Sequence, residues 1–544
     1  MTKHLFFLLL IAGCTGVCKP LYAQRCAQLS MESFGGNKSE GVSDRVIVHN
    51  DGTFSLYVES ESTTGNINTS CSAIFPGGGP GSFYYRRYNT AGTSILNEYC
   101  APKTTSFYPE YWFAQPNGDT IFIGNKEIPG RSDEIAIERR SASGVLLWSK
   151  YYGGTGSDGL GNVIPAPDGG FFIATGTNST DGDVGLHYGS GFDADIWILR
   201  VDNSGDKLWG KVLGGTLPDL PGDIKLSPDG GCYVFGVTAS VDHDAIGTKG
   251  ESDLYIVKLD SLGQKQWHRC LGGTGSDGSG YDHAILCLED GIGGFYILNR
   301  TSSNDGDVQR RVPLDDGPDF WLVHIDSLAH ILWESTFGGP GWQVPSVFCR
   351  AADGSFWMGG QNLSSRTGGM IEVTYGMTDS WVVHADSLGN FINQRSFGNN
   401  KEDQVDMLYP LPDGTVLAGG RYYEPTTPGP ASPGFPQTSE GELDIFLTRL
   451  GPETVGVRDK ILDPATWEVF PNPGNRLIQF RVKNGDKHKY ALLITDGAGR
   501  TRCKATFRDK LELDISQWAA GIYRATLSDR SGNAGTKNIV VSQP

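Results

Sequence analysis

The sequence is short of basic residues and of long apolar segments. Lys and Arg number 45 against 62 Asp and Glu, a formal net charge of −17 over 544 residues. Because nucleic acids and anionic membrane surfaces require a basic footprint, neither is an expected partner. The one long apolar run, residues 5–13, is too short to span a bilayer, so no transmembrane helix is predicted. Segments with helical hydrophobic periodicity are missing from residues 29–450.

The apolar run near the N-terminus has the features of an export signal. Lys3 precedes it, and Ala23 followed by Gln24 suits cleavage by signal peptidase, so we predict a signal peptide over residues 1–23. The residues that end at Cys14 also resemble a lipoprotein box, and in that alternative Cys14 would carry a lipid anchor. We favour the signal peptide because Gln24 suits the first residue of a mature chain.

Cysteine does not indicate a metal site in this sequence. Two of the ten Cys, Cys14 and Cys18, fall within the predicted signal peptide. The others have irregular spacings and contain no CxxC pair, so zinc is not predicted. Export would permit disulfides among them, but the spacings do not define a connectivity.

Glycine, by contrast, is abundant and follows a repeated pattern. The chain has 75 Gly, and an Asp-Gly or Asn-Gly turn between two apolar runs recurs along it. Such turns suit tight hairpins because glycine adopts positive φ at little cost. They begin at residues 51, 117, 168, 229, 290, 353 and 413.

Each turn belongs to a predicted unit of four short strands. One strand precedes the turn, and an alternating strand such as FFIATG at 171–176 follows it. A strand opened by an acidic residue comes next, as in DADIWILRVD at 193–202, and then a strand that ends in Gly-Gly, as at 214–215. Radial stacking would bury both faces of such sheets, so the copies predict an all-β fold with a seven-bladed β-propeller over residues 24–450.

The ends of the repeat region predict how the ring closes. The last copy stops after its third strand, at Leu450, and LSMESFGG at 29–36 has the features of a lone fourth strand. We therefore predict that the N-terminal strand completes the last blade. In this topology the tight turns share one rim, and the long loops between second and third strands share the other with the Gly-Gly connections. A functional site is expected on this loop rim.

A different pattern begins after a predicted linker at residues 451–466. Short alternating strands from Trp467 onward predict a small immunoglobulin-like β-sandwich over residues 467–544. The segment FPNP at 470–473, the turn at 496–500 and AGIY at 520–523 closely resemble the type A sorting domain of the type IX secretion system of Bacteroidota. The resemblance implies that residues 467–544 engage that secretion machinery, that the protein crosses the outer membrane, and that it is then released or held at the cell surface.

Candidate binding residues lie in the long loops. Asp181 with Asp183, and Asp305 with Asp307, form Asp-x-Asp pairs whose carboxylates are of the type that binds calcium, the one cofactor suggested by the sequence. The complete DxDxDG spacing is missing, so an Asx turn in an acidic loop is the alternative. Trp342 departs from the repeat and is predicted to be an exposed surface on which a ligand stacks.

These features together predict an exported propeller that binds a protein or glycan ligand, and we expect a binding module rather than an enzyme. Two alternatives stay open: a hydrolase or lyase that acts on polysaccharide or peptide through loop-rim carboxylates, and a structural matrix protein. No catalytic residue is predicted, because His187 and His243 near the loop rim have no acid–base partner that the sequence reveals.

Overall fold

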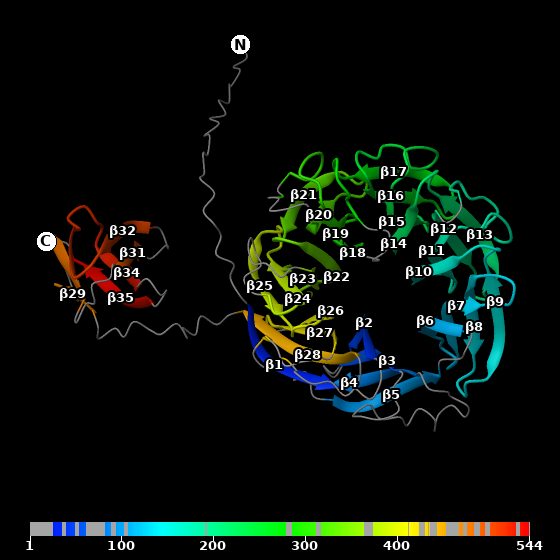
Figure 1. The fold of residues 1–544 in the computed structure, drawn as a ribbon, viewed down its shortest axis with the longest axis horizontal. Helices are drawn as coiled ribbons and strands as arrows, with labels where there is room; N and C mark the ends of the chain where they lie inside the picture. Colours follow the sequence, from blue (N-terminus) through cyan, green and yellow to red (C-terminus); the bar gives the residue numbers. More distant parts are fainter. Residues whose placement is uncertain are drawn as a thin grey trace, which may run out of the picture. The chain divides into compact units, whose positions relative to one another are not determined.

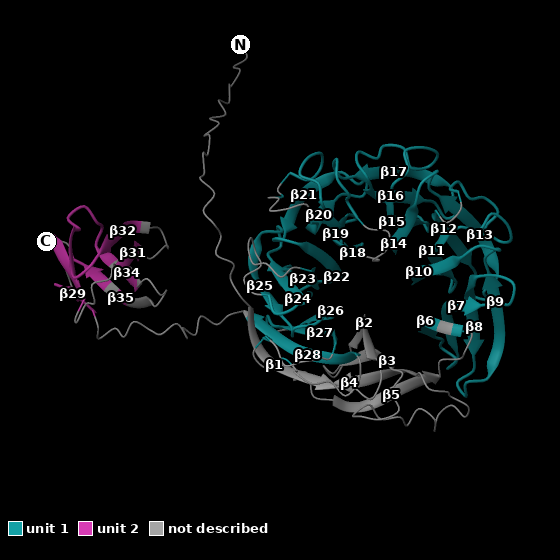
Figure 2. Ribbon diagram, in the orientation of Figure 1, with its two compact units in different colours: residues 1–452 teal, residues 453–544 magenta. Residues whose placement is uncertain are grey.

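The computed structural model divides into two compact units, residues 1–452 and residues 453–544 (Figure 2). It describes residues 26–34, 40–48, 54–60, 82–88, 94–102, 107–190, 193–278, 285–309, 311, 317–363, 374–411, 413–423, 430–432, 435, 443–452, 467–471, 476–482, 490–495, 501–528 and 534–542, with only the strand backbone before Phe107. Among these residues there is no helix, and therefore none able to cross a membrane. The predicted signal peptide, residues 1–23, and residues 453–466 of the predicted linker lie outside the described residues.

Seven four-stranded antiparallel sheets, counted over the described residues, form a ring in the first unit (Figure 1). Six of them, blades 1 to 6, each consist of four consecutive strands. Blade 1 consists of β2 (Glu40–Val48), β3 (Phe54–Ser60), β4 (Ser82–Tyr88) and β5 (Ser94–Pro102), and blade 2 of β6 (Phe107–Ala114), β7 (Thr120–Glu127), β8 (Asp133–Arg140) and β9 (Leu146–Tyr152). Blade 3 consists of β10 (Asp158–Pro165), β11 (Phe171–Thr177), β12 (Asp195–Val201) and β13 (Lys207–Leu213), and blade 4 of β14 (Asp219–Leu226), β15 (Cys232–Thr238), β16 (Asp253–Leu259) and β17 (Lys265–Leu271). Blade 5 consists of β18 (Leu286–Glu289), β19 (Phe295–Thr301), β20 (Asp319–Ile325) and β21 (Ile331–Phe337), and blade 6 of β22 (Trp342–Arg350), β23 (Phe356–Leu363), β24 (Asp379–Ala385) and β25 (Phe391–Phe397).

Blade 7 joins the two ends of the ring. It contains β26 (Asp403–Pro410), β27 (Val416–Tyr423), β28 (Leu443–Pro452) and β1 (Cys26–Phe34), in the order β1-β28-β27-β26. Strand β1 runs antiparallel to β28, with Phe34 opposite Ile445. The predicted seven-bladed propeller, and its closure by the N-terminal strand, are therefore confirmed.

The core of the ring lies between neighbouring blades. Strands in the interior of a sheet are buried on both faces, as along the whole of the third strands β12 and β16, because each blade is covered by the next. Trp197, Trp321 and Trp381, one from the third strand of a blade each, are completely buried. Burial of each such ring contributes about 2–3 kcal/mol to packing.

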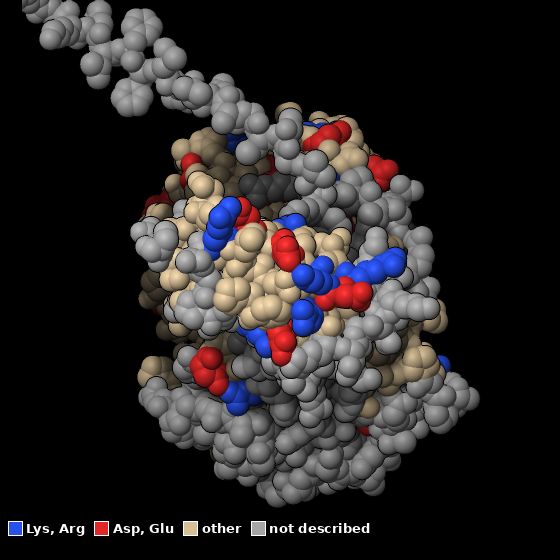
Figure 3. All heavy atoms as spheres, turned by 90° about the vertical axis from the view of Figure 1, so that its left-hand side faces the viewer, with Lys and Arg blue, Asp and Glu red and all other residues tan. Residues whose placement is uncertain are grey.

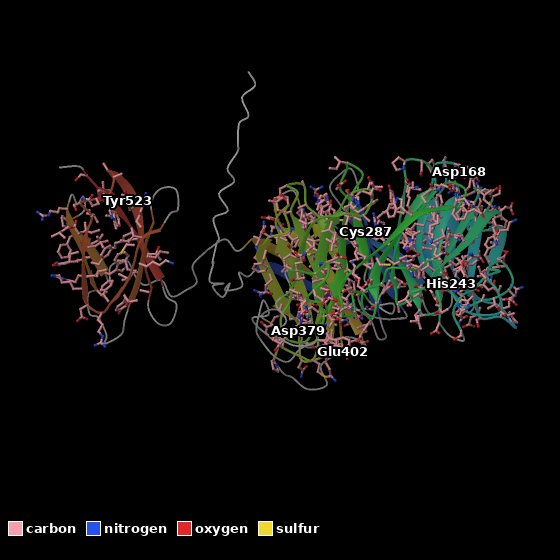
Figure 4. The ribbon with its side chains drawn as sticks, turned by 90° about the horizontal axis from the view of Figure 1, so that it is seen from above. Asp168, His243, Cys287, Asp379, Glu402 and Tyr523 are labelled. Carbon is pink, nitrogen blue, oxygen red and sulfur yellow. The ribbon has the colours of Figure 1, made fainter. Side chains whose placement is uncertain are left out.

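The tight turns gather on one rim, where their acids bind a basic residue of the third strand. Arg200 lies 2.6 Å from Asp168, and Lys258 lies 2.7 Å from Asp229. Asp168 lies on the rim opposite to His243 and Asp379, as the view from above shows (Figure 4). Because this contact recurs from blade to blade, its role is structural. These ion pairs lower the pKa of Asp168 and lower that of Asp229 to about 2.

The second unit is a small sandwich of two antiparallel sheets. One has the order β29-β30-β33 and the other β32-β31-β34-β35. Their strands are β29 (Trp467–Phe470), β30 (Leu477–Val482), β31 (Tyr490–Thr495), β32 (Thr501–Phe507), β33 (Lys510–Asp514), β34 (Gly521–Ser528) and β35 (Ala534–Val541). Trp467, Ile494 and Leu527 are buried in one cluster between the sheets, which confirms the predicted sandwich.

Candidate functional site

The loops between the second and third strands determine the shape of the loop rim. In blade 2 this loop is only residues 128–132, whereas it is much longer in every other blade. The longer loops cover residues 61–81, 178–194, 239–252, 302–318, 364–378 and 424–442. Blade 2 is thus the one that breaks the symmetry of this rim.

A long loop folds back over the Gly-Gly turn that enters its own blade. In blade 3, Asp183 N donates to Gly153 O at 2.8 Å, and Asp181 Oδ1 accepts from Thr155 N at 2.7 Å. In blade 5 the same bonds join Asp307 N to Gly272 O at 2.9 Å and Thr274 N to Asp305 Oδ1 at 2.7 Å. The first acid of each Asp-x-Asp pair therefore holds a turn between blades.

The second acid of each pair faces a lysine. Asp183 lies 3.9 Å from Lys207, and Asp307 pairs with Lys249. Over the described residues, no group of three or more His, Cys, Asp and Glu side chains is placed to hold a metal ion. Calcium binding by these pairs stays a prediction.

The short loop of blade 2 leaves a recess with a volume of about 970 Å³. It is lined by residues 126–133 of the loop and its flanking strands, by Tyr151 at the end of β9 and by Ser157 of the next turn. This is the asymmetric feature in which a ligand site on a repetitive ring is expected.

A lysine and a tyrosine form one side of the recess. Lys126 Nζ donates to Tyr151 Oη at 2.9 Å, lies 4.7 Å from the centre of the Tyr151 ring, and is 3.4 Å from Glu138. Burial lowers the pKa of Lys126, but the hydrogen bond to Tyr151 and the charge of Glu138 outweigh it and raise the pKa above its ordinary value. Lys126 is therefore a cation at neutral pH.

The loop supplies a second cation to the recess. Arg131 Nη1 donates to Glu134 Oε1 at 3.1 Å, and its side chain stays 46% exposed while that of Glu134 is completely buried. Tyr151 is 37% exposed. The recess thus presents the Tyr151 ring beside two positive groups, Lys126 and Arg131, whose charges are partly neutralised by Glu138 and Glu134.

The other predicted site residues lie elsewhere on the rim. Trp342 opens β22 at the connection between blades 5 and 6, is 53% exposed, and has the Arg300 guanidinium 6.0 Å from its ring centre. His187 Nε2 lies 2.6 Å from Asp193 O, and His243 stacks on Tyr188 at 4.5 Å. Trp342 and Tyr151 therefore belong to different blades. His187 makes a contact within its own loop, and His243 makes a contact between the loops of blades 3 and 4.

The surface charge is mixed on the face shown in Figure 3, where Lys and Arg side chains lie beside Asp and Glu side chains. Basic groups do not gather there into a single patch of the kind that nucleic acid requires.

Comparison with known proteins identifies the second unit. Residues 468–542 match the family described as "Secretion system C-terminal sorting domain". The second unit is a type IX sorting domain. This sorting domain indicates secretion to the cell surface or outside the cell, through the type IX machinery. No curated protein matches the chain.

Solved structures similar to the chain include propeller-like proteins. Hydrazine synthase from Kuenenia stuttgartiensis has 10% identity over 69% of this chain and 92% of its own, with a TM-score of 0.36. A DUF4221 family member from Bacteroides vulgatus has 9% identity over 63% of this chain and 97% of its own, with a TM-score of 0.29. The seven sheets themselves, rather than these similarities, establish the propeller.

The recess was not predicted from the sequence, because it forms where a long loop between the second and third strands of a blade is missing. The motifs of the long loops do not indicate it, since the recess forms where blade 2 has only residues 128–132 between its second and third strands. Comparing the seven loop lengths in the sequence would have marked this blade.

Proposed function

We propose that the protein is a binding module, exported through a signal peptide, that captures a glycan in the blade 2 recess at or beyond the cell surface. The observation that carries this proposal is the recess of about 970 Å³ at the one blade with a short loop. Sites for small ligands are usually concave and combine an aromatic side chain with a few polar groups.

The chemistry of the recess favours a hydroxyl-rich ligand with some negative charge. Tyr151 offers an apolar ring face and a hydroxyl, which suits a sugar ring that has both apolar and polar edges. Lys126 and Arg131 offer donors, while Glu127 and Asp133 add acceptors at the edge. A strongly acidic ligand is less suited, because the two cations already have carboxylate partners.

Binding to an array of neutral and acidic glycans tests the proposal. We expect Tyr151→Ala and Lys126→Ala to weaken binding about tenfold or more, which corresponds to roughly 1.4 kcal/mol. Leu147→Ala is the matched control, because Leu147 is exposed on the same strand and does not line the recess. Loss of binding in Trp342→Ala, with Tyr151→Ala unaffected, would contradict the recess and support the sequence-based prediction instead.

Delivery is tested separately from binding. Removal of residues 467–544 should leave the propeller in the periplasm, because the sorting domain is the part that the secretion machinery recognises. The purified propeller should still bind the same glycans. Normal surface delivery of the truncated protein would contradict the role of this domain without affecting the recess.

A further inference from the structure

Two buried acids lie side by side where neighbouring blades meet. At the interface of blades 3 and 4, Asp219 N donates to Ala194 O at 2.7 Å, which brings Asp219 next to Asp195. A side-chain carbon built on Gly214 would lie 2.5 Å from Asp219 Oδ2 and 2.7 Å from Asp195 Oδ1. Both acids are completely buried.

The same arrangement recurs around the ring: an acid of a third strand faces an acid that precedes or begins the first strand of the next blade, across the glycine that follows the fourth strand. We call these the acid pairs. They are Glu134 with Asp158, Asp195 with Asp219, Asp253 with Asp277, and Asp379 with Asp403.

Each acid pair leaves at least one oxygen without a hydrogen-bond partner among the described residues, and in the pair of Asp195 and Asp219 both Oδ1 atoms are without one. Asp219 Oδ2 accepts from Gly215 N at 2.7 Å and from Ser240 Oγ at 2.8 Å. Asp195 Oδ1 has no partner among the described residues, although it borders the same glycine. The corresponding oxygens Glu134 Oε2 and Asp253 Oδ1 are also unpartnered and border their glycines. In the fourth pair the unpartnered oxygen is Asp403 Oδ1, which belongs to the first-strand acid. A buried acceptor that faces another acceptor is costly unless a proton or a cation lies between them.

The interface of blades 5 and 6 provides an internal comparison. There Gln343 replaces the first-strand acid, and its Oε1 accepts from Gly339 N at 3.1 Å, as Asp219 accepts from Gly215 N. The third-strand acid, Asp319, lies 2.9 Å from the buried guanidinium of Arg311. At this interface an arginine neutralises the third-strand acid, and the second position is an amide. Glu134 also has an arginine partner, Arg131, although Asp158 occupies the second position there.

Asp195 and Asp219 lack such an arginine partner among the described residues around them. The titratable groups that interact with this acid pair are His243, Tyr188 and Asp242 from the loops, and Tyr255 and Cys270 from β16 and β17. The nearby lysine, Lys211, lies 3.7 Å from Asp244 instead. Burial raises the pKa of Asp195 to about 7 and that of Asp219 to about 6, and each pKa is raised further by a neighbouring carboxylate.

We propose that the two carboxyls share one proton in the three acid pairs that have no arginine partner among the described residues, so that carboxyl–carboxylate hydrogen bonds close three of the blade interfaces. A proton needs only two oxygens, whereas calcium needs six to eight, which the described residues do not bring together here. Loss of the proton leaves two like charges in a buried contact. The interfaces are therefore a pH-sensitive seam that tightens in acid and loosens as the pH rises.

Asp195→Asn tests the proposal, because the amide oxygen keeps the acceptor for Tyr188 N, while the amide nitrogen, in place of the unpartnered Oδ1, supplies a permanent donor toward Asp219. We expect its Tm at pH 8 to exceed that of the unsubstituted protein by about 2–4 °C. The two Tm values should converge near pH 5, where the pair already holds its proton. Glu251→Gln, which changes an exposed acid of the loop at residues 239–252, is the control and should leave the pH dependence unchanged. An unchanged pH dependence in Asp195→Asn would overturn the proposal.

Infrared spectroscopy of the unsubstituted protein gives a second test that needs no variant. A protonated carboxyl band should persist near pH 6, where ordinary Asp and Glu are ionised. Absence of this band would overturn the proposal. So would a Tm at pH 8 that rises with calcium, falls with chelator and loses this response in Asp195→Asn, because a cation would then occupy the pair.

Discussion

The propeller places two populations of aspartate in opposite environments. On the rim formed by the tight Asp-Gly turns, which we call the turn rim, Asp229 lies 2.7 Å from Lys258, and this contact lowers the pKa of Asp229 to about 2. At the blade interface, Asp195 faces Asp219, and burial raises the pKa of Asp195 to about 7. One residue type therefore stabilises the folded ring as an anion in one place and as an acid in the other.

The difference shows which contacts depend on charge. Turn-rim ion pairs lie within one blade, where a basic residue of the third strand binds the turn between the first and second strands. The acid pairs lie between blades, where packing is tight enough to exclude water. In this chain of net charge −17, some of the acidic side chains are therefore buried at the interfaces between blades.

The largest effect is expected when a blade is left incomplete. Deletion of residues 24–36 removes β1, the partner of β28, and leaves an unpaired edge in blade 7. We expect the Tm to fall by more than about 10 °C, because the ring then opens. Circular dichroism of the deleted and full propeller would measure this. An unchanged melt would show that closure by β1 does not hold the ring together.

Substitution at a seam glycine should have the next largest effect. Gly214 has φ +149°, and an added side-chain carbon would contact both Asp195 and Asp219. We expect Gly214→Ala to lower the free energy of unfolding by about 2–4 kcal/mol in denaturant titrations. Gly159→Ala is the matched control, because nothing lies within 4 Å of its added carbon, and it should be close to neutral. Equal losses in both would contradict tight packing at the seam.

The two acid populations predict a stability maximum on the acid side of neutrality. The raised pKa of Asp195 gives stability that is complete below pH 4 and is lost as the pH rises through about 7. The lowered pKa of Asp229 gives stability that is present above pH 4 and is lost as the pH falls toward 2. We expect the highest Tm near pH 5, with a fall of about 5 °C by pH 8, in a melting series at constant ionic strength.

Asp229→Asn separates the two populations within that series. It should cost about 1–2 kcal/mol at pH 7, because buried Lys258 loses its carboxylate partner. The fall in Tm between pH 5 and 8 should be the same as in the unsubstituted protein. Asp206→Asn is the control, because Asp206 and Lys150 form an exposed pair worth about 0–1 kcal/mol. If Asp229→Asn abolished the fall in Tm between pH 5 and 8, that fall would come from the ion pairs of the turn rim and not from the acid pairs.

The blade repeat was predictable from sequence because local turns carry it. Each Asp-Gly turn and alternating strand marks its own hairpin, and the lone strand at 29–36 matched the missing strand after Leu450. The acid pairs were not predicted, although both positions recur in the sequence. Asp195 and Asp219 belong to different blades, and only blade packing brings them to the same glycine. The recess depends on a missing loop, which a search for motifs does not reveal.

The smallest effect is expected from calcium at the Asp-x-Asp pairs, which distinguishes hydrogen-bonding acids from metal ligands. Asp305 already accepts from Thr274, and Asp307 pairs with Lys249, so an ion would have to compete with these contacts. A ligand bound only by the folded state must raise stability, and we expect millimolar calcium to raise the Tm by no more than about 2 °C. Asp305→Asn combined with Asp307→Asn should remove that rise if these carboxylates bind the ion. If calcium has no effect, the acids of the loop rim act only as caps for the turns between blades.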